Sequence, residues 1–351
     1  MNNVKSGAKT KNRVITINSY NSEKPLVSII VPSFNHHLWV CEAIESALQQ
    51  TYKNIELIVI DDGSNNETRE VIRNFRKIKT NEFIYIEKQN EGIVRTLNSA
   101  LRIVNGDYVA ILASDDLLCP TKIEVQVDLL ESLPYVDSVF CPQYEIDETG
   151  KIIGTRGFLN KYFTNLIGVN HTDPIIPPNK WDIVELIMGA VAHPFEPQSA
   201  LTRANVYYAL NGFDESIELD DIDFNLRAAM HGFIPRFHSE ILHKVRIHDN
   251  QASSKAHWLY DNVLLSLDKF YSQPGIPSRI RKYKRYNKAL YHFGLANSLR
   301  ANGDINEAIT EYLNWVVRFP DKVFPSAIRF LRLRYPNVFN SMRVNLKRSK
   351  F

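Results

Sequence analysis

The chain has few cysteines, no long apolar run and no large excess of one charge. Its 351 residues include three cysteines, Cys41, Cys119 and Cys141, with no close pair among them. An odd, scattered set argues against a disulfide framework and favours reduced thiols. No stretch approaches the roughly 20 apolar residues of a membrane-spanning helix. The first 24 residues are polar and lack the apolar segment of a signal peptide. We expect a flexible leader over 1–24 and a cytoplasmic protein.

The charges nearly balance, but they are unevenly distributed. The chain carries 42 Lys and Arg against 39 Asp and Glu, a net charge of +3. Basic residues concentrate in 278–288 and 344–351. Two interpretations stay open for such runs: a solvated helix face, or a surface for an anionic partner such as a phospholipid membrane. We expect no nucleic-acid partner.

Apolar runs alternate with helical patterns from residue 26 to residue 141. Five buried strands are predicted at 26–31, 55–60, 83–87, 107–113 and 136–141. Helices are predicted between them at 37–50, 66–78, 92–104 and about 120–133. Asn66 is the predicted cap of the second helix. Unbroken alternation predicts an α/β fold with a parallel, doubly wound sheet and right-handed crossovers. The proline-rich stretch 142–200 breaks the pattern and predicts a loop-rich insert that carries specificity.

The last part of the chain has a helical pattern of its own. Residues 289–321 predict two helices around Gly303 and Asp304, and they resemble one tetratricopeptide unit. A single unit cannot bury its own apolar face, so it must pack on the preceding domain or on a partner. Residues 324–351 mix basic and apolar side chains. They predict either a segment that lies on an anionic membrane or ordinary helical packing.

Four segments carry the polar groups that suggest chemistry. They are IVPSFN (30–35), VIDDGS (59–64), ILASDDLL (111–118) and LDDIDFNLR (219–227). The first three end predicted strands, and the ends of parallel strands meet at the crevice where such sheets bind ligands. Each acidic pair alone could be a turn or a helix cap. Together they repel one another unless something neutralises them, and a metal ion with a nucleotide diphosphate would do so.

Residues 25–250 closely resemble a family 2 glycosyltransferase of the GT-A fold. The matching segments run in the family's order, from PLVSIIVPSFN through DDGS, NEGIVRTLNSAL, SDD and GFDESIELDDIDFNLRAAMHG to VRIHDNQAS. The resemblance does not extend to 260–351. It implies a Rossmann-like GT-A domain with a mostly parallel sheet over 25–258, followed by a helical region over 259–351.

On this chain the resemblance implies a donor site at the end of the first two strands. Pro32, Ser33 and Phe34 would form the base pocket. Asp62 would accept a hydrogen bond from a nucleobase N–H, which suits the imide of uracil or thymine, and a UDP-sugar is the expected donor. Arg95 would add positive charge near the nucleotide.

The same resemblance implies a metal site in the SDD segment. Asp115 would lie toward the ribose, and Asp116 would bind the Mn²⁺ or Mg²⁺ ion that bridges the two phosphates. His248 would contact the diphosphate or the metal, although a purely structural histidine is the alternative.

The acceptor side is expected at 218–223. The resemblance makes Asp221 the general base, with Asp220 where the family usually has Glu. Asp223 and Glu218 stay open as substitutes for the base. These parts suit an inverting displacement, in which the acceptor hydroxyl attacks the anomeric carbon as the nucleoside diphosphate leaves.

The expected acceptor is a glycan or a lipid-linked oligosaccharide in bacterial surface polysaccharide synthesis, which fits an enzyme peripheral to the inner face of the membrane. Two other functions compete with this one. A nucleotidyltransferase would need a Gly-rich, basic phosphate loop after the first strand, and IVPSFNHH has none. A non-enzymatic helical adaptor would have no reason to keep both acidic segments.

Overall fold

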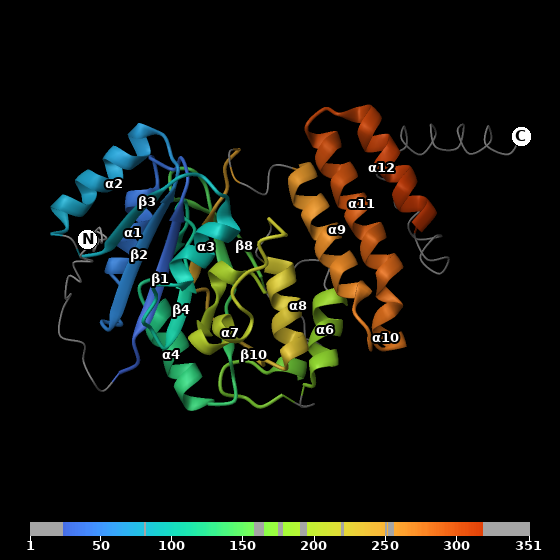
Figure 1. Ribbon diagram of the computed structural model, residues 1–351, viewed down its shortest axis with the longest axis horizontal. Helices are drawn as coiled ribbons and strands as arrows, with labels where there is room; N and C mark the ends of the chain where they lie inside the picture. Colours follow the sequence, from blue (N-terminus) through green and yellow to red (C-terminus); the bar gives the residue numbers. More distant parts are fainter. Residues whose placement is uncertain are drawn as a thin grey trace, which may run out of the picture.

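A computed structural model describes residues 24–80, 82–157, 165–174, 178–189, 195–218, 221–249, 251 and 256–318. Over these ranges a mixed α/β domain stands beside a group of C-terminal helices (Figure 1). The central sheet is mostly parallel, as predicted. The basic segment 324–351 lies outside the described residues. No helix among those described is long and apolar enough to cross a membrane.

The central sheet has seven strands in the order β10-β6-β9-β4-β1-β2-β3. In chain order they are β1 (Val27–Ser33), β2 (Ile55–Asp62), β3 (Ile84–Lys88), β4 (Tyr108–Ile111), β6 (Ser138–Phe140), β9 (Leu201–Arg203) and β10 (Pro235–Phe237). All five predicted strands are present, and β1 runs parallel to both β2 and β4. Strand β9 is antiparallel to β4 and β6. The carboxyl ends of β1, β2 and β4 therefore lie at one edge of the sheet.

Helices cover both faces of this sheet, which is why β1 is buried along its whole length. One face packs on α1 (Val40–Leu48), α2 (Asn66–Ile78) and α4 (Lys122–Ser132). The other packs on α3 (Ile93–Leu101) and α7 (Ala204–Ala209). The predicted cap of α2 was wrong by one residue, because Asn65 accepts the bond from the Thr68 N–H at 3.0 Å.

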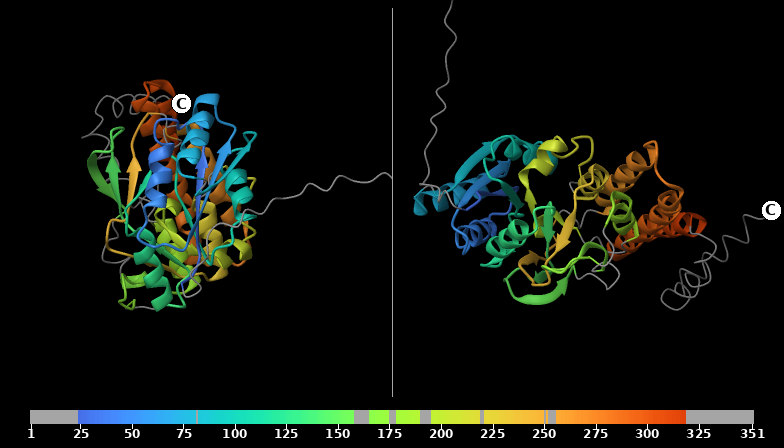
Figure 2. Two further views of the ribbon diagram at one scale, coloured as in Figure 1. Left: turned by 90° about the vertical axis from the view of Figure 1, so that its left-hand side faces the viewer. Right: turned by 90° about the horizontal axis from the view of Figure 1, so that it is seen from below.

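A second sheet forms where the sequence predicted mainly loops. Its order is β5-β11-β7-β8, with β5 (Leu117–Leu118), β7 (Gln143–Ile146), β8 (Ile152–Arg156) and β11 (His243–Arg246). Figure 2 shows β7 and β8 in green beside β11 in gold. The stretch 142–200 also contains α6 (Lys180–Gly189) and the 3₁₀ turn η1 (Pro197–Ser199). The prediction of a loop-rich insert was therefore wrong for its described part, because β7 and β8 form a hairpin and β7 also pairs with the distant β11.

The C-terminal helices pack on one another and on the α/β domain. They are α9 (Ala256–Ser272), α10 (Ser278–Arg281), α11 (Tyr283–Ala301) and α12 (Ile305–Arg318). Helix α8 (Asp221–His231) comes before β10 in the chain and contacts them from the α/β domain. The two helices predicted around Gly303 are confirmed as α11 and α12. The expected domain boundary after residue 258 falls in the first turn of α9 and stays a prediction. Helices α6, α8 and α9 share one apolar core.

Several cations of the basic run 278–288 are used inside the molecule. Arg279 lies 2.8 Å from Asp182, and Lys288 lies 2.6 Å from Asp268. Lys282 lies 3.5 Å from Glu185. These pairs fasten α10 and α11 to α6 and α9, so this part of the run fits intramolecular contacts better than a separate anionic partner.

Lys122 is a fully buried cation that ties α4 to η1. Its Nζ donates to Gln126 Oε1 at 2.7 Å, to Ser199 O at 3.0 Å and to Ala200 O at 3.3 Å. Burial lowers the pKa of Lys122 from 10.5 to about 8. The folded state therefore binds this proton less tightly than the unfolded state does.

Because the pKa of Lys122 differs between the folded and the unfolded chain, the free energy of unfolding should depend on pH. Between about pH 8 and about pH 10.5 the unfolded chain is protonated at Lys122 while the folded chain is not, so folding is favoured as the pH rises. The free energy of unfolding of the wild type should gain up to about 3 kcal/mol over Lys122→Met across this window. The three acceptors favour the ammonium and make this an upper limit. Urea unfolding at several pH values measures it, with exposed Lys77→Met as the control. If the free energy of unfolding changes with pH in the same way in the wild type and in Lys122→Met, the predicted contribution of Lys122 is contradicted.

Candidate functional site

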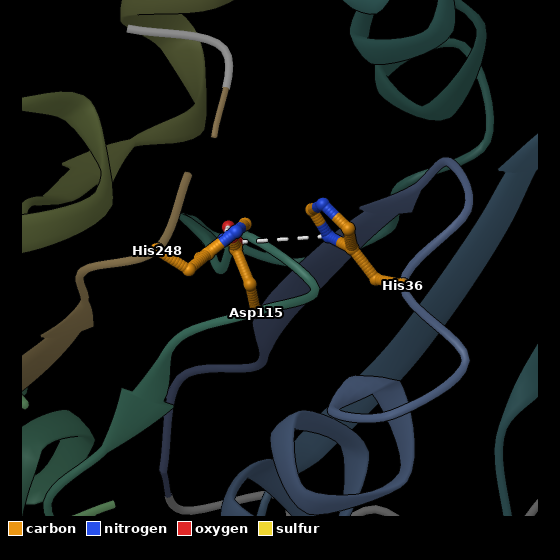
Figure 3. A group of neighbouring side chains, drawn as sticks. All are labelled: His36, Asp115 and His248. Atoms are coloured by element: carbon orange, nitrogen blue, oxygen red, sulfur yellow. Dashed lines mark hydrogen bonds and ion pairs between the residues drawn. The ribbon is translucent and has the colours of Figure 1, made fainter. Parts of the chain in front are cut away.

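Three side chains converge at the carboxyl-terminal edge of the central sheet. His36 follows β1, Asp115 follows β4, and His248 follows β11. The Asp115 carboxylate lies between the two rings, 3.0 Å from His248 Nε2 and 3.8 Å from His36 Nδ1 (Figure 3). One ligand atom from each residue lies within 4.8 Å of the other two. His36 was not identified from the sequence, although its place directly after the first strand end was the available signal.

The protonation of this group suits metal binding. Burial lowers the pKa of His36, against the attraction of Asp115, and so favours the neutral imidazole that a metal requires. Burial alone would raise the pKa of Asp115, but the hydrogen bond from His248 and the charge of His36 hold it below its usual value. The Nδ1 atom of His248 is buried and has no partner among the described residues. Two imidazoles and one carboxylate are a set of ligands that could hold a divalent metal ion.

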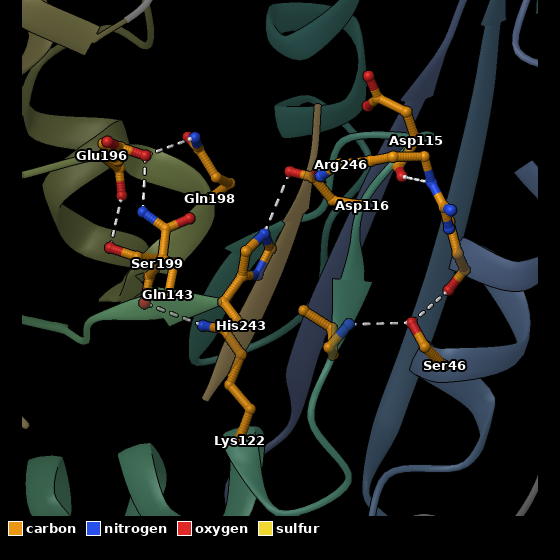
Figure 4. Close-up of polar contacts among 12 residues, drawn as sticks. Ser46, Asp115, Asp116, Lys122, Gln143, Glu196, Gln198, Ser199, His243 and Arg246 are labelled. Carbon is orange, nitrogen blue, oxygen red and sulfur yellow. Dashed lines mark hydrogen bonds and ion pairs between the residues drawn. The ribbon is translucent and has the colours of Figure 1, made fainter. Parts of the chain in front are cut away.

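Asp116 has a different environment from Asp115. Its Oδ1 accepts from the Arg246 N–H at 2.9 Å, and its Oδ2 lies 3.2 Å from His243 Nε2 (Figure 4). Burial and the neighbouring Asp115 raise the pKa of Asp116 well above its usual range. Burial also lowers the pKa of His243 well below its usual value. Asp116 therefore holds β11 in place, and the geometry favours Asp115 instead of Asp116 as the metal ligand.

Arg246 connects the strands that carry Asp115 and His248. Its guanidinium is buried and donates to Asp115 O at 2.9 Å, to Glu148 O at 2.8 Å and to Glu42 Oε2 at 2.8 Å. The guanidinium also lies over the Trp39 ring, 5.6 Å from its centroid. Trp39 in turn lies 4.3 Å from the His248 ring. Sequence analysis did not single out Arg246 or Trp39, because their partners are distant in the chain.

The predicted donor residues lie at the ends of β1 and β2. Pro32 and Ser33 are buried in β1, whereas Phe34 is 44% exposed just beyond it. Asp62 accepts from Lys88 Nζ, Glu91 N and Gly92 N, each at 2.9 Å. It therefore fixes the loop between β3 and α3, and its capacity to bind a base is reduced but not removed.

Two further residues of the donor side, Arg95 and Asp61, have surroundings that the sequence did not predict. Arg95 is largely exposed and lies 3.6 Å from Glu215. Asp61, which the sequence did not favour over its neighbour, is fully buried. Its Oδ2 has no hydrogen-bond partner among the described residues, while its Oδ1 accepts from Arg69 at 2.9 Å.

On the acceptor side, Asp221 is the first residue of α8. Burial raises its pKa to about 6, and the nearby Glu196 adds to the shift. Asp223 is buried and pairs with Arg227 at 2.6 Å, so its charge is already used. Asp220 lies outside the described residues. Of the acids placed here, Asp221 has the pKa that a general base at neutral pH needs.

The sequence of this chain is similar to those of known glycosyltransferases. Residues 28–180 match the model of Glycosyl transferase family 2. The chain is 35% identical over 237 residues to an uncharacterized glycosyltransferase of Rickettsia conorii, covering 66% of this chain and 35% of that protein. It is 32% identical over 241 residues to one of Rickettsia typhi, covering 67% of this chain and 68% of that protein. The match thus spans about a third of the first relative's length.

Two solved structures share the fold. One is the mannosyltransferase PcManGT of Pyrobaculum calidifontis in complex with GDP-Man and Mn²⁺, with a TM-score of 0.56, 16% identity and coverage of 94% of this chain and 86% of that one. The other is S. aureus TarS 1–349 in complex with UDP-GlcNAc, with a TM-score of 0.58, 14% identity and 93% coverage of each chain. At these identities the likeness establishes the GT-A fold alone.

The different environments of the two neighbouring acids predict different effects on metal binding. Asp115→Asn should weaken Mn²⁺ binding by about 100-fold or more, because a charged ligand is lost. Asp116→Asn should change it by less than about ten-fold, since an amide resembles the uncharged acid that burial favours and can still accept from Arg246 N. Isothermal titration with Mn²⁺ measures both. Loss of binding in Asp116→Asn alone would assign the metal to Asp116.

Proposed function

Since the chain belongs to glycosyltransferase family 2, we propose that it transfers a sugar from a nucleotide-sugar, preferably a UDP-sugar, to a hydroxyl of a glycan or lipid-linked acceptor. The observation that carries this proposal is the convergence of His36, Asp115 and His248 at the ligand-binding edge of a GT-A sheet. Bacterial surface polysaccharide synthesis is the proposed setting. Two proteins of this fold were solved with nucleotide-sugars, one of them also with Mn²⁺, which supports the donor class.

In this proposal His36, Asp115 and His248 hold a divalent metal ion. When bound, such an ion neutralises the diphosphate and stabilises it as a leaving group. Arg246 and Trp39 keep the site in shape, because Arg246 fixes the Asp115 backbone and Trp39 packs against the His248 ring. A preorganised group of ligands loses little free energy to rearrangement when the ion binds.

The donor's base is proposed to lie over the end of β1. Phe34 offers an exposed ring there, beside buried Pro32 and Ser33. The remaining lone pairs of Asp62 would accept the imide N–H of uracil. A carboxylate can accept the imide N–H of uracil or of thymine.

Asp221 is the proposed general base. It accepts the proton of the acceptor hydroxyl as that oxygen bonds to the anomeric carbon and the bond from this carbon to the phosphate oxygen breaks. The electron pair of the broken bond leaves with the nucleoside diphosphate, and the configuration at the anomeric carbon inverts. A pKa of about 6 keeps Asp221 ionised at neutral pH and still basic enough to take a proton.

A donor panel tests the function as a whole. Purified full-length protein is incubated with UDP-, GDP-, CDP- and dTDP-sugars, and release of the nucleoside diphosphate is followed with and without Mn²⁺. We expect release from a UDP-sugar that depends on Mn²⁺ and stops when EDTA is added, because the diphosphate needs a counter-charge to leave. Release that is independent of divalent ions, or none from any donor, would reject the proposal.

The base assignment has its own test. Asp221→Asn should lower the transfer rate by about 10²–10⁴-fold while the affinity for UDP stays unchanged. In the wild type, the rate should rise with pH through about 6, as Asp221 loses its proton, and then level off. Asp223→Asn is the control, since its partner is Arg227, and it should keep this pH limb. If the residual activity of Asp221→Asn still rises with pH through about 6, another residue is the general base.

A further inference from the structure

The C-terminal helices bring aromatic side chains to the neighbourhood of Asp221. Trp258 and Tyr260 lie on α9, and Tyr291 lies on α11. All three are half-buried and so retain some exposed surface. They lie outside residues 28–180, which the family model matches. In Figure 1, α9 and α11 stand beside α6 and α8.

These helices are fixed firmly to the segment that leads into Asp221. Trp258 Nε1 donates to Glu218 Oε2 at 2.7 Å, and the Glu218 N–H donates to Asn262 Oδ1 at 2.9 Å. Below these bonds, Ile222 of α8 shares an apolar core with Val263 of α9, and Tyr291 packs against that core. The aromatic side chains are therefore held in a defined position relative to the base.

Tyr260 and Tyr291 form an edge-to-face pair, with ring centroids 6.1 Å apart and planes at 61°. Gly294, three residues after Tyr291, lets the Tyr260 ring lie directly on α11, because a Cβ there would come within 2.6 Å of that ring. Neither hydroxyl has a hydrogen-bond partner among the described residues, although tyrosines in protein interiors usually find one. The pair therefore offers two positioned rings with free hydroxyls.

Packing brings Tyr291 toward the start of α8, because Tyr291 lies against the apolar core that contains Ile222, the residue after Asp221. The pKa of Tyr291 is raised by burial first and then by the negative charge of Asp221, which agrees with this placement. An acceptor that gives its proton to Asp221 would extend toward these rings.

We propose that Tyr260 and Tyr291 form the acceptor subsite, and that the accepting unit is an uncharged sugar ring. This inference rests on the proposed function. A pyranose has an apolar C–H face that packs on an aromatic ring and a rim of hydroxyls that bonds to phenol oxygens. The pair supplies both kinds of surface beside the base.

The charges around the start of α8 argue against a phosphate-bearing acceptor. Lys269 pairs with Asp214, Arg227 with Asp223, and Arg156 with Glu196. Each of these cations already pairs with an acid, so a phosphate would have to compete with that acid for it. A neutral glycan requires no such exchange.

The test measures binding in the full chain, separately from catalysis. Saturation-transfer difference NMR uses three probes: neutral disaccharides of glucose, galactose and N-acetylglucosamine, glycerol phosphate, and a short-chain alkanol. Wild type is compared with Tyr260→Ala, Tyr291→Ala and the milder Tyr291→Phe. Tyr208→Ala is the matched control, because Tyr208 is 55% exposed on α7.

We expect at least one disaccharide to bind wild type and Tyr208→Ala equally. Its Kd should rise about ten-fold or more in each alanine variant, and several-fold in Tyr291→Phe, which loses only the hydroxyl. The subsite is overturned if folded Tyr260→Ala or Tyr291→Ala binds the disaccharide as tightly as the wild type does. It is also overturned if the wild type binds only glycerol phosphate or the alkanol, or if it binds none of the three probes. If the alanine variants do not fold, unchanged affinity in folded Tyr291→Phe overturns it.

The donor panel keeps this inference apart from the proposed function. Tyrosine-dependent sugar binding without release of any nucleoside diphosphate would leave the subsite standing and reject the transferase. Mn²⁺-dependent release from a UDP-sugar, with sugar binding that ignores both tyrosines, would support the transferase and reject the subsite.

Discussion

Two aspartates next to each other at a strand end cannot share one environment, and the site depends on how the fold separates them. Asp116 is turned toward β11, where Arg246 N and His243 bind its oxygens. Asp115 is turned the other way, between His36 and His248. Burial disfavours charge on Asp116, while imidazole donors favour it on Asp115. One carboxylate is thereby available for a cation, and the other holds the strand that delivers His248.

The second sheet helps to separate the environments of Asp115 and Asp116, because its strand β11 carries Arg246. Strand β11 pairs with β5 and β7, and its residue Arg246 reaches α1, the β7–β8 turn and the Asp115 carbonyl. Breaking such a buried cation's contacts would leave an uncompensated charge in the interior. We infer that the hairpin of β7 and β8, which lies outside the central sheet, supports the metal group through Arg246.

On the acceptor side, the C-terminal helices help to position Asp221. Helix α8 begins with Asp221 and shares its apolar core with α6 and α9. The position of Asp221, the proposed base, is thus coupled to the packing of helices that follow it in the chain. The proposed subsite of Tyr260 and Tyr291 would let this region select the acceptor, while the central sheet handles the donor. Such a division suits a fold in which related sheets serve different acceptors.

Local sequence patterns were enough to predict the alternating strands and helices, the mostly parallel sheet and the helix pair around Gly303, and they drew attention to residues 114–116 and 245–253 as candidates. These follow from local periodicity and from short motifs, which adjacent residues specify. Only the folded chain shows that Asp115 is the aspartate between the two histidines, that His36 is one of them, and that Arg246 and Trp39 lie beside them. Their partners come from strands and helices far apart in the chain, so only packing and burial in three dimensions can assign these roles.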